Sequence, residues 1–470
     1  MKIEQIYTGC LAEAAYYIES NGEAAIIDPL REVAPYLKKA VDQGATIKYI
    51  FETHFHADFV SGHLDLAKQS GAKIVYGPTA QTAFDAYIAT DGEIFEIGHI
   101  KIKVLHTPGH TLESTTYLLI DENGNEHCIF TGDTLFIGDV GRPDLAQKGD
   151  LTMEDLAGML YDSLNTKIKP LADDVIVYPA HGAGSACGKN MSKETFDTLG
   201  HQKEVNYALK ASTKAQFIAE VTDGILPPPQ YFAQNVAMNK GGYESLEAVY
   251  QKGLVPLNPQ AFEDLANISG ALLLDTRDPQ VFAKGFIPNA INIGLNGQFA
   301  PWVGALVPDL KQAILLITEE GKEQEAITRL ARVGYDNTIG YLAGGMQSWQ
   351  AAQKEVDTIE SISASEFENA YLENENISTL DVRKPGEYAA EHLEFTLARP
   401  LDYINEWTSS LNPAETYFIH CAGGYRSMIA ASILKARGIS NVIDVAGGYG
   451  AIKNTNLKRS DFMCQSKLMR

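Results

Sequence analysis

The sequence has 470 residues, and because domains usually contain roughly 100–200 residues, this length predicts about three of them. The formal net charge of −22 repels nucleic-acid phosphates and anionic lipid head groups, so we expect no nucleic acid and no membrane as partner. No apolar run is long enough to span a bilayer, and the N-terminus lacks a basic stretch followed by an apolar one. These features favour a cytoplasmic protein.

Cysteine is sparse, with an odd count and no Cys-x-x-Cys pair, which argues against a disulfide framework and against a zinc ribbon. We expect reduced thiols, and we expect four of the five to be structural or surface groups, because free cysteine usually behaves as a small hydrophobe. The five are Cys10, Cys128, Cys187, Cys421 and Cys464.

Up to about residue 240 the chain alternates short β-rich runs with polar clusters that contain His or Asp. Residues 24–27, 101–105 and 175–178 are such runs and predict strands. The proline-rich stretch 226–230 and the later glycines at 241 and 242 interrupt regular structure, so we place a domain boundary near residue 245.

Four clusters of imidazole and carboxylate groups follow the β-rich runs. A single loop histidine is in most proteins only hydrogen-bonded to its surroundings, but four clusters in succession at predicted strand ends indicate a metal site. The groups are His54, His56 and Asp58 after the run 49–51, then His106 and His110, then Asp133, and finally His181.

The order His-x-His-x-Asp, Pro-Gly-His-Thr, Thr-Gly-Asp and Pro-Ala-His resembles the ligand sequence of the metallo-β-lactamase fold, an αββα sandwich. Dinuclear zinc members carry a further histidine directly after the aspartate, where this chain has Phe59. A phenyl ring offers no lone pair and displaces water from the second metal pocket. We therefore expect a mononuclear site.

Within that fold the chain most resembles the persulfide dioxygenases, which implies one Fe(II) per chain. Two imidazoles and one carboxylate leave neighbouring positions open for substrate and O₂, an openness from which redox-inert zinc gains nothing. Carried over by position, the ligands are His54, His110 and Asp133, while His56, Asp58 and His181 orient ligands and water. Whether His56 also enters the coordination shell stays open.

Two further residues lie downstream of this ligand set. Arg142 belongs to a Gly-Arg-x-Asp element typical of the family, and it either pairs with a substrate carboxylate or anchors the loop through Asp144. Cys187, in a glycine-rich stretch after His181, either meets persulfide sulfur or is a passive thiol.

Beyond residue 245 the chain repeats itself. The segment 273–277 returns as 379–383, and the segment 342–346 returns as 445–449, about 105 residues later in each case. Within each copy, apolar runs such as 313–317 and 417–420 alternate with helical stretches, which predicts a doubly wound parallel sheet. We therefore expect domains at 1–244, 245–356 and 357–458, followed by a tail at 459–470.

In the second copy, Cys421 opens a glycine-bearing loop between a predicted strand and a predicted helix. Backbone N–H groups, the helix dipole and Arg426 converge there, which favours a thiolate and then an anionic persulfide. The six-residue loop 421–426 resembles that of a rhodanese domain. Asp381 and Arg383 match the structural Asp-x-Arg pair of that family.

The first copy lacks this chemistry. Aligned on its strand, it places Thr318 at the position of Cys421 and Glu323 at that of Arg426, and its loop contains three acids. Those acids fill the anion site with the protein's own charge, so we predict a catalytically silent copy that spaces or assembles the other domains.

The domain order resembles bacterial fusions of a persulfide dioxygenase with rhodanese domains. It implies oxidation of low-molecular-weight thiol persulfides by O₂ to sulfite, and thiosulfate formation at Cys421 from sulfite and sulfane sulfur; we also expect a homo-oligomer. One rival is a thioester hydrolase of the glyoxalase II type, with a rhodanese sulfur carrier attached. Another is a sulfur-carrier module whose metal domain is vestigial.

Overall fold

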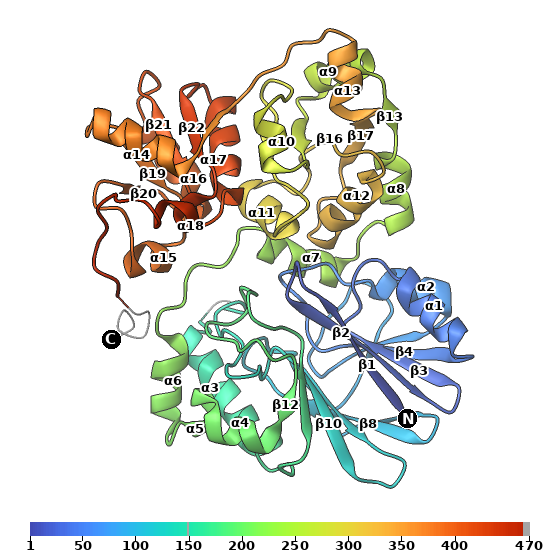
Figure 1. Cartoon of the computed structure of the whole chain (residues 1–470). Helices are drawn as coiled ribbons and strands as arrows, with labels where there is room; N and C mark the ends of the chain where they lie inside the picture. Colours follow the sequence, from blue (N-terminus) through green and yellow to red (C-terminus); the bar gives the residue numbers. More distant parts are fainter. Residues whose placement is uncertain (148–149, 464–470) are drawn as a thin grey trace. The chain divides into compact units, whose positions relative to one another are not determined.

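The computed structural model describes residues 1–147 and 150–463 of the chain, so Cys464 and most of the expected tail lie outside the described residues. It divides into two compact units, one comprising Met1–Leu246 with Ala331–Gly334 and the other comprising the rest (Figure 1). No helix in the described ranges combines the length and the apolar character needed to cross a bilayer. The boundaries at 245, 357 and 459 stay predictions.

The first unit is a sandwich of two six-stranded sheets (Figure 1). Aromatic and aliphatic side chains from both sheets, such as Tyr16, Phe51, Tyr117 and Phe130, form the core between them. A second apolar cluster joins the outer face of one sheet to α1 and α2, and a third joins the other sheet to α3 and α6. The result is the predicted αββα arrangement.

The first sheet contains β1 (Lys2–Thr8), β2 (Glu13–Ser20), β3 (Glu23–Ile27), β4 (Thr46–Glu52), β5 (Lys73–Tyr76) and β6 (Tyr87–Ile88). The second contains β7 (Ile94–Ile97), β8 (Ile100–His106), β9 (Thr115–Ile120), β10 (Glu126–Gly132), β11 (Ile176–Pro179) and β12 (Asp197–Thr198). The helices are α1 (Ala34–Asp42), α2 (His63–Ser70), α3 (Met153–Ser163), α4 (Leu199–Val205), α5 (Tyr207–Lys210), α6 (Lys214–Thr222) and α7 (Phe232–Gly241). The helix α7 begins after the proline-rich stretch and continues through Gly241, which the sequence predicted to interrupt it; it ends before Gly242, whose φ is +90°.

Strand direction gathers the polar clusters of this unit at one edge. β8 and β10 are both antiparallel to β9, and β11 is parallel to β10, so β8, β10 and β11 all run the same way. Their carboxyl ends therefore lie at the same edge of the sheet. In the facing sheet, the loop after β4 contributes His54 and His56.

The second unit contains two parallel five-stranded sheets with identical topology, β13-β17-β16-β14-β15 and β18-β22-β21-β19-β20. Even the register repeats, because Asp275 pairs with Ile317 in the first sheet as Asp381 pairs with His420 in the second. The predicted duplication and the predicted fold class, an αββα sandwich followed by two doubly wound parallel sheets, are confirmed. Local signals match the structure, for example at α9, which begins after Asn258 with Pro259 and ends at the left-handed Gly270.

The first copy contains α8 (Leu246–Gly253), β13 (Pro256–Leu257), α9 (Pro259–Ser269), β14 (Leu272–Asp275), α10 (Pro279–Ala283), β15 (Ile291–Asn292), α11 (Phe299–Leu306), β16 (Ile314–Ile317), α12 (Glu323–Arg332), β17 (Thr338–Leu342) and α13 (Gly345–Ala351). The second contains β18 (Glu360–Ile362), α14 (Ala364–Glu373), β19 (Ser378–Asp381), α15 (Pro385–Ala390), β20 (Leu397–Ala398), α16 (Ile404–Trp407), β21 (Tyr417–His420), α17 (Tyr425–Ala436), β22 (Val442–Val445) and α18 (Gly448–Ile452).

Candidate functional sites

Three of the expected ligands come together at the strand ends of the first unit. Nε2 of His110 lies 3.4 Å from Oδ2 of Asp133, and Nε2 of His54 lies 3.9 Å from the same oxygen. All three side chains are buried. Both carboxylate oxygens of Asp133 lack a hydrogen-bond donor within residues 1–147 and 150–463, a costly arrangement for a buried carboxylate unless a cation completes it. The donor set therefore fits a metal ion.

The other ring nitrogens fix the tautomers of the two histidines. Nδ1–H of His110 donates to the carbonyl oxygen of Arg142 at 2.8 Å, which leaves the lone pair on Nε2. Nδ1 of His54 lies 3.0 Å from Oγ1 of Thr53, whose hydroxyl already donates to Asp28 at 2.8 Å. The hydroxyl oxygen is then the acceptor, so Nε2 of His54 also carries its lone pair. Burial and the neighbouring histidines lower the pKa of His54 well below its ordinary value, which favours this neutral form.

Glycine at position 132 permits the close approach of the two sheets at this site. Its φ is +51°, and a Cβ there would lie 2.5 Å from Oγ1 of Thr53. A side chain at Gly132 would therefore displace the hydroxyl that orients His54.

A second group of ligand atoms lies beside the first. Single atoms of His56, Asp58 and His181 lie within 4.8 Å of one another, and Nε2 of His181 is 3.5 Å from Oδ1 of Asp133. The phenyl ring of Phe59 is fully buried and packs against the His56 ring, with centroids 4.3 Å apart. The structure thus brings these groups together and places an apolar ring against one of them.

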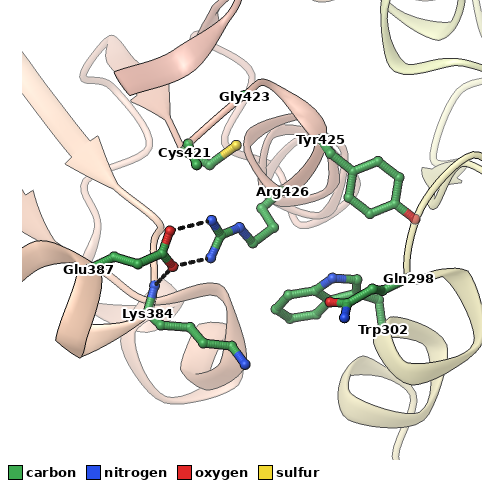
Figure 2. Close-up of a pocket in the computed structure, with 9 residues that line it drawn as sticks. Gln298, Trp302, Lys384, Glu387, Cys421, Gly423, Tyr425 and Arg426 are labelled. Carbon is green, nitrogen blue, oxygen red and sulfur yellow. Dashed lines mark hydrogen bonds and ion pairs between the residues drawn. The ribbon is translucent and has the colours of Figure 1, made fainter. Parts of the chain in front are cut away.

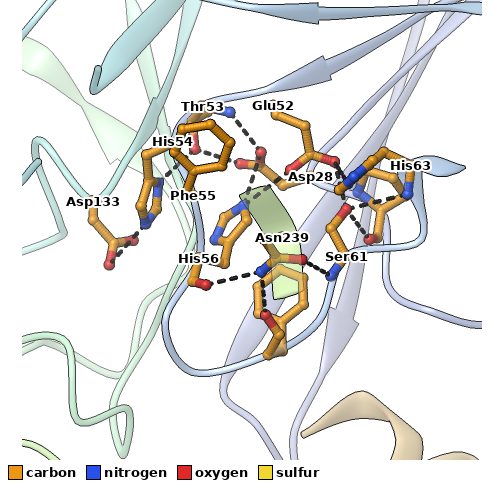
Figure 3. Close-up of polar contacts among 12 residues, drawn as sticks. Asp28, Glu52, Thr53, His54, Phe55, His56, Ser61, His63, Asp133 and Asn239 are labelled. Carbon is orange, nitrogen blue, oxygen red and sulfur yellow. Dashed lines mark hydrogen bonds and ion pairs between the residues drawn. The ribbon is translucent and has the colours of Figure 1, made fainter. Parts of the chain in front are cut away.

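The imidazole of His56 is also tied to a buried acidic network that the sequence alone did not reveal (Figure 3). Its Nε2 lies 3.1 Å from Asp28 and 3.5 Å from Glu52, and these carboxylates raise the pKa of His56 well above its ordinary value although burial opposes the charged form. Glu52 also accepts from the hydroxyl of Ser61 and lies 3.3 Å from His63. The sequence does carry one hint of this network: an acidic residue, Asp28 or Glu52, stands at the end of each of two β-rich runs.

Asn239 in α7 holds the loop that carries His56. Its Nδ2 donates to the carbonyl oxygens of His56 and Phe59 at 2.9 and 2.8 Å, and its Oδ1 accepts from the backbone N–H of Ser61 at 3.0 Å (Figure 3). A polar residue far along the chain therefore fixes the first ligand loop.

The contacts of Arg142 favour its anchoring role. Its guanidinium donates to both carboxylate oxygens of Asp144 at 2.6 and 2.7 Å, and to the carbonyl oxygens of Ala186 and Leu226. Cys187 lies in a group with Asp133 and His181 whose ligand atoms are within 4.8 Å of one another. Burial raises the pKa of the Cys187 thiol well above its ordinary value, which favours a protonated thiol.

In the second unit, Cys421 follows β21 and faces the N-terminus of α17. Its side chain is buried, and the backbone N–H of Gly424 donates to its sulfur at 3.1 Å. The start of α18 holds the loop, since the N–H groups of Tyr449 and Gly450 donate to the carbonyl oxygens of Cys421 and Ala422 at 2.6 and 2.9 Å. The sulfur thus accepts a hydrogen bond from one backbone N–H group of the predicted loop.

Arg426 has a partner that the sequence did not predict. Its two terminal nitrogens donate to Glu387 at 2.6 and 2.9 Å (Figure 2). Burial opposes ionisation of Glu387, but this ion pair holds the pKa of Glu387 below its ordinary value. Asp381 and Arg383 form a separate buried pair at 2.6 Å, and Arg383 also donates to the carbonyl oxygen of Glu391 at 2.8 Å.

In the corresponding loop of the first copy, one of the three acids, Glu323, contacts a backbone N–H group. Thr318 is buried after β16, and the N–H of Gly321 donates to the carboxylate of Glu323 at 3.3 Å. A carboxylate thus accepts from a loop N–H group where the second copy presents a thiol.

Comparison with known proteins gives two family matches. Residues 8–181 match the metallo-beta-lactamase superfamily, and residues 258–352 and 363–455 match the rhodanese-like domain. A relative named probable hydroxyacylglutathione hydrolase, from Schizosaccharomyces pombe, is 33% identical over 181 residues, which are 37% of this chain and 66% of that protein. The mitochondrial persulfide dioxygenase of Homo sapiens is 30% identical over 211 residues, or 44% of this chain and 74% of that protein.

Among solved structures, a metallo-beta-lactamase from Staphylococcus aureus is 32% identical with a TM-score of 0.64. The match covers 73% of this chain and 98% of that one, so it extends beyond the metal-binding unit.

Proposed function

Because this chain belongs to the metallo-beta-lactamase superfamily and carries two rhodanese-like domains, we propose that it couples two sulfur reactions. The first unit would be a non-haem iron dioxygenase that oxidises low-molecular-weight thiol persulfides to sulfite. The second rhodanese-like copy would transfer sulfane sulfur through Cys421 to that sulfite. The domain order and the likeness to the human persulfide dioxygenase support this proposal.

One observation favours a dioxygenase over a two-metal hydrolase. Phe59 stands where dinuclear relatives would have a ligand histidine, and its ring packs on His56. His54, His110 and Asp133 then remain as a group whose ligand atoms lie within 4.8 Å of one another and which contains no residue packed against that ring. Two imidazoles and one carboxylate with open neighbouring positions suit Fe(II), which would supply the redox chemistry that O₂ requires.

The residues of the chain orient the reaction. Arg142 and Thr53 hold the two imidazoles, and the pair of Arg142 with Asp144 holds the loop from which the carbonyl of Arg142 projects. In the overall reaction, R–S–SH, O₂ and water give R–SH, sulfite and two protons. The buried surroundings exclude bulk water, so that the reactive sulfur anion meets O₂ rather than solvent.

At the second site, the Cys421 thiolate attacks the outer sulfur of R–S–SH and releases R–S⁻. Sulfite then attacks the outer sulfur of the Cys421 persulfide, the sulfur–sulfur bond breaks, and thiosulfate leaves while the Cys421 thiolate is restored. The N–H of Gly424 and the amino end of α17 stabilise the anionic sulfur.

The deciding experiment offers two substrates to the purified, iron-loaded protein. It should consume O₂ with glutathione persulfide and leave S-lactoylglutathione intact. Thioester hydrolysis without oxygen uptake would reject the dioxygenase.

A second candidate is a metal-dependent thioester hydrolase fused to a rhodanese sulfur carrier. Two observations favour it: relatives named hydroxyacylglutathione hydrolase match at similar identity, and His56, Asp58 and His181 still approach one another within 4.8 Å. A hydrolase would use a metal-bound water and two metals per chain. Metal content therefore separates the two candidates independently of substrate.

A further inference from the structure

A cavity of about 330 Å³ opens in front of Cys421, and both rhodanese-like copies line it (Figure 2). A space of this size holds several water molecules and exceeds what sulfite needs. The silent copy contributes Gln298 and Trp302, and the catalytic copy contributes Lys384, Glu387 and Arg426 besides the cysteine. The space therefore suits a donor with a carbon skeleton.

The wall from the silent copy is held in place by direct contacts. The hydroxyl of Tyr425 donates to the carbonyl oxygen of Gly294 at 2.7 Å. A Cβ at Gly297 would lie 2.6 Å from the Tyr425 ring, so the backbone before Gln298 packs directly on that ring. This packing sets the start of α11, which carries Trp302.

Trp302 offers an apolar face and a donor to the cavity. Its side chain is 6% exposed, and its indole N–H has no acceptor in the part of the chain that the structure describes. The other two tryptophans differ, because Trp349 and Trp407 donate to the carbonyl oxygens of Glu355 and Pro400 at 2.7 and 2.9 Å. The indole N–H of Trp302 can therefore donate a hydrogen bond to a molecule in the cavity.

Of the two cationic side chains that line the cavity among the described residues, Arg426 has an acidic partner and Lys384 has none. The carboxylate of Glu387 neutralises Arg426 through two hydrogen bonds. Lys384 is exposed, and its ammonium has no acidic partner among residues 1–147 and 150–463. Figure 2 shows that its side chain extends toward the side of the cavity on which Trp302 lies. A second anionic group on the donor, distinct from its reacting sulfur, would find its counter-charge here.

We propose that the silent copy completes the donor site of Cys421 through Trp302, and that this site, with Lys384 of the catalytic copy, selects organic persulfides that carry a carboxylate. Trp302 packs against the carbon skeleton, Lys384 pairs with the carboxylate, and the loop N–H groups hold the reacting sulfur. The chemistry is the first transfer step given above: a bond forms between Sγ of Cys421 and the outer sulfur, and the donor leaves as R–S⁻. This inference rests on the proposed sulfur transfer at Cys421.

The test compares two persulfides of similar size on the full chain, those of 3-mercaptopropionate and of propane-1-thiol. The rate of persulfide formation on Cys421 gives kcat/KM for each. Lys384→Ala should lower kcat/KM for the carboxylate donor about tenfold relative to the uncharged donor, as expected for loss of a charge-assisted contact. Trp302→Ala should lower both values about tenfold or more, because it removes apolar contact from the pocket.

Controls keep the test decisive. Lys453→Ala removes an exposed lysine that does not line the cavity and should keep the wild-type preference. Trp302→Phe keeps a ring and removes only the donor, so it reports on the subsite if the alanine variant fails to fold. An unchanged preference in Lys384→Ala would overturn the selection for a carboxylate, and unchanged kcat/KM in both Trp302→Phe and Trp302→Ala would overturn the part taken by the silent copy. Full transfer activity in Cys421→Ser would instead reject the proposed function.

Discussion

At the residue scale, the two candidate ligand histidines are oriented by different kinds of acceptor. A backbone carbonyl fixes His110, whereas a hydroxyl relay from Asp28 through Thr53 fixes His54. Loss of a hydrogen-bond partner that orients a ligand histidine usually lowers metal affinity about 10–100-fold. The relay depends on one side chain and can therefore be tested by substitution.

Thr53→Val removes the hydroxyl and keeps the shape of the side chain. We expect metal affinity to fall about 10–100-fold, since Nδ1 of His54 loses its acceptor and the ring can rotate. Competition with a chromophoric chelator measures the change. Thr338→Val is the matched control, because the Thr338 hydroxyl is buried without a partner among the described residues, and it should leave metal affinity unchanged.

Cys421→Ser tests the division of labour between the two sites. We expect oxygen uptake with glutathione persulfide to continue while sulfite accumulates in place of thiosulfate. The reason is that a serine hydroxyl is not ionised near neutral pH and cannot carry sulfane sulfur. Chromatography of the sulfur anions gives the ratio. Cys10→Ser, which changes a partly exposed thiol, should leave this ratio as in the wild type. An unchanged thiosulfate yield in the Cys421 variant would mean that this loop takes no part in thiosulfate formation.

At the element scale, function depends on how closely neighbouring elements approach. The loop after β21 is held by the start of α18, where Gly448 has a φ of +52° and a Cβ would lie 2.4 Å from the carbonyl oxygen of Cys421. The equivalent Gly345 of the first copy has more room, with 3.1 Å to the carbonyl oxygen of Thr318. A side chain at position 448 would therefore meet the closer contact of the two.

Gly448→Ala should displace this loop. Because a shift of about 1 Å in a reacting group can cost about 100-fold in rate, we expect a loss of sulfur transfer of that order, with oxygen uptake unchanged. A thiosulfate:cyanide transfer assay measures it. Gly438→Ala is the control, since Gly438 also has a positive φ of +85° but no atom within 4 Å of the added Cβ. It shares the strain of about 1–2 kcal/mol from the left-handed backbone and lacks the clash.

At the scale of the whole molecule, the candidate metal ligands and Cys421 belong to different compact units. The first unit contains the complete candidate ligand set, and the second contains the loop of Cys421 together with both walls of its cavity. Each chemistry should therefore survive the loss of the other.

Metal removal tests this independence. Dialysis against a chelator should abolish oxygen uptake and keep thiosulfate:cyanide transfer, and Fe(II) should restore uptake at one ion per chain. Two zinc ions per chain with thioester hydrolysis would favour the hydrolase instead. Protein that purifies without stoichiometric metal and binds none would favour a sulfur-carrier module with a vestigial metal domain.

The sequence by itself determined the fold class and the duplication, and it named the candidate metal ligands and the candidate nucleophile. It could do so because this information is local: ligand types follow β-rich runs directly, as at 49–58, and Cys421 opens its loop between one strand and one helix. The repeated segments at 273–277 and 379–383 likewise carry the same buried ion pair in both copies.

Only the tertiary structure decided which partners these residues have. The pairing of Arg426 with Glu387, the contact of Asn239 with the loop of His56, and the cavity that Trp302 and Cys421 both line join residues far apart in the chain. No local pattern encodes such pairs, because they arise when separate elements pack and each buried polar group must find a partner. The first rhodanese-like copy shows this most clearly, since its sequence has Thr318 in place of the thiol while its fold lines the cavity in front of Cys421.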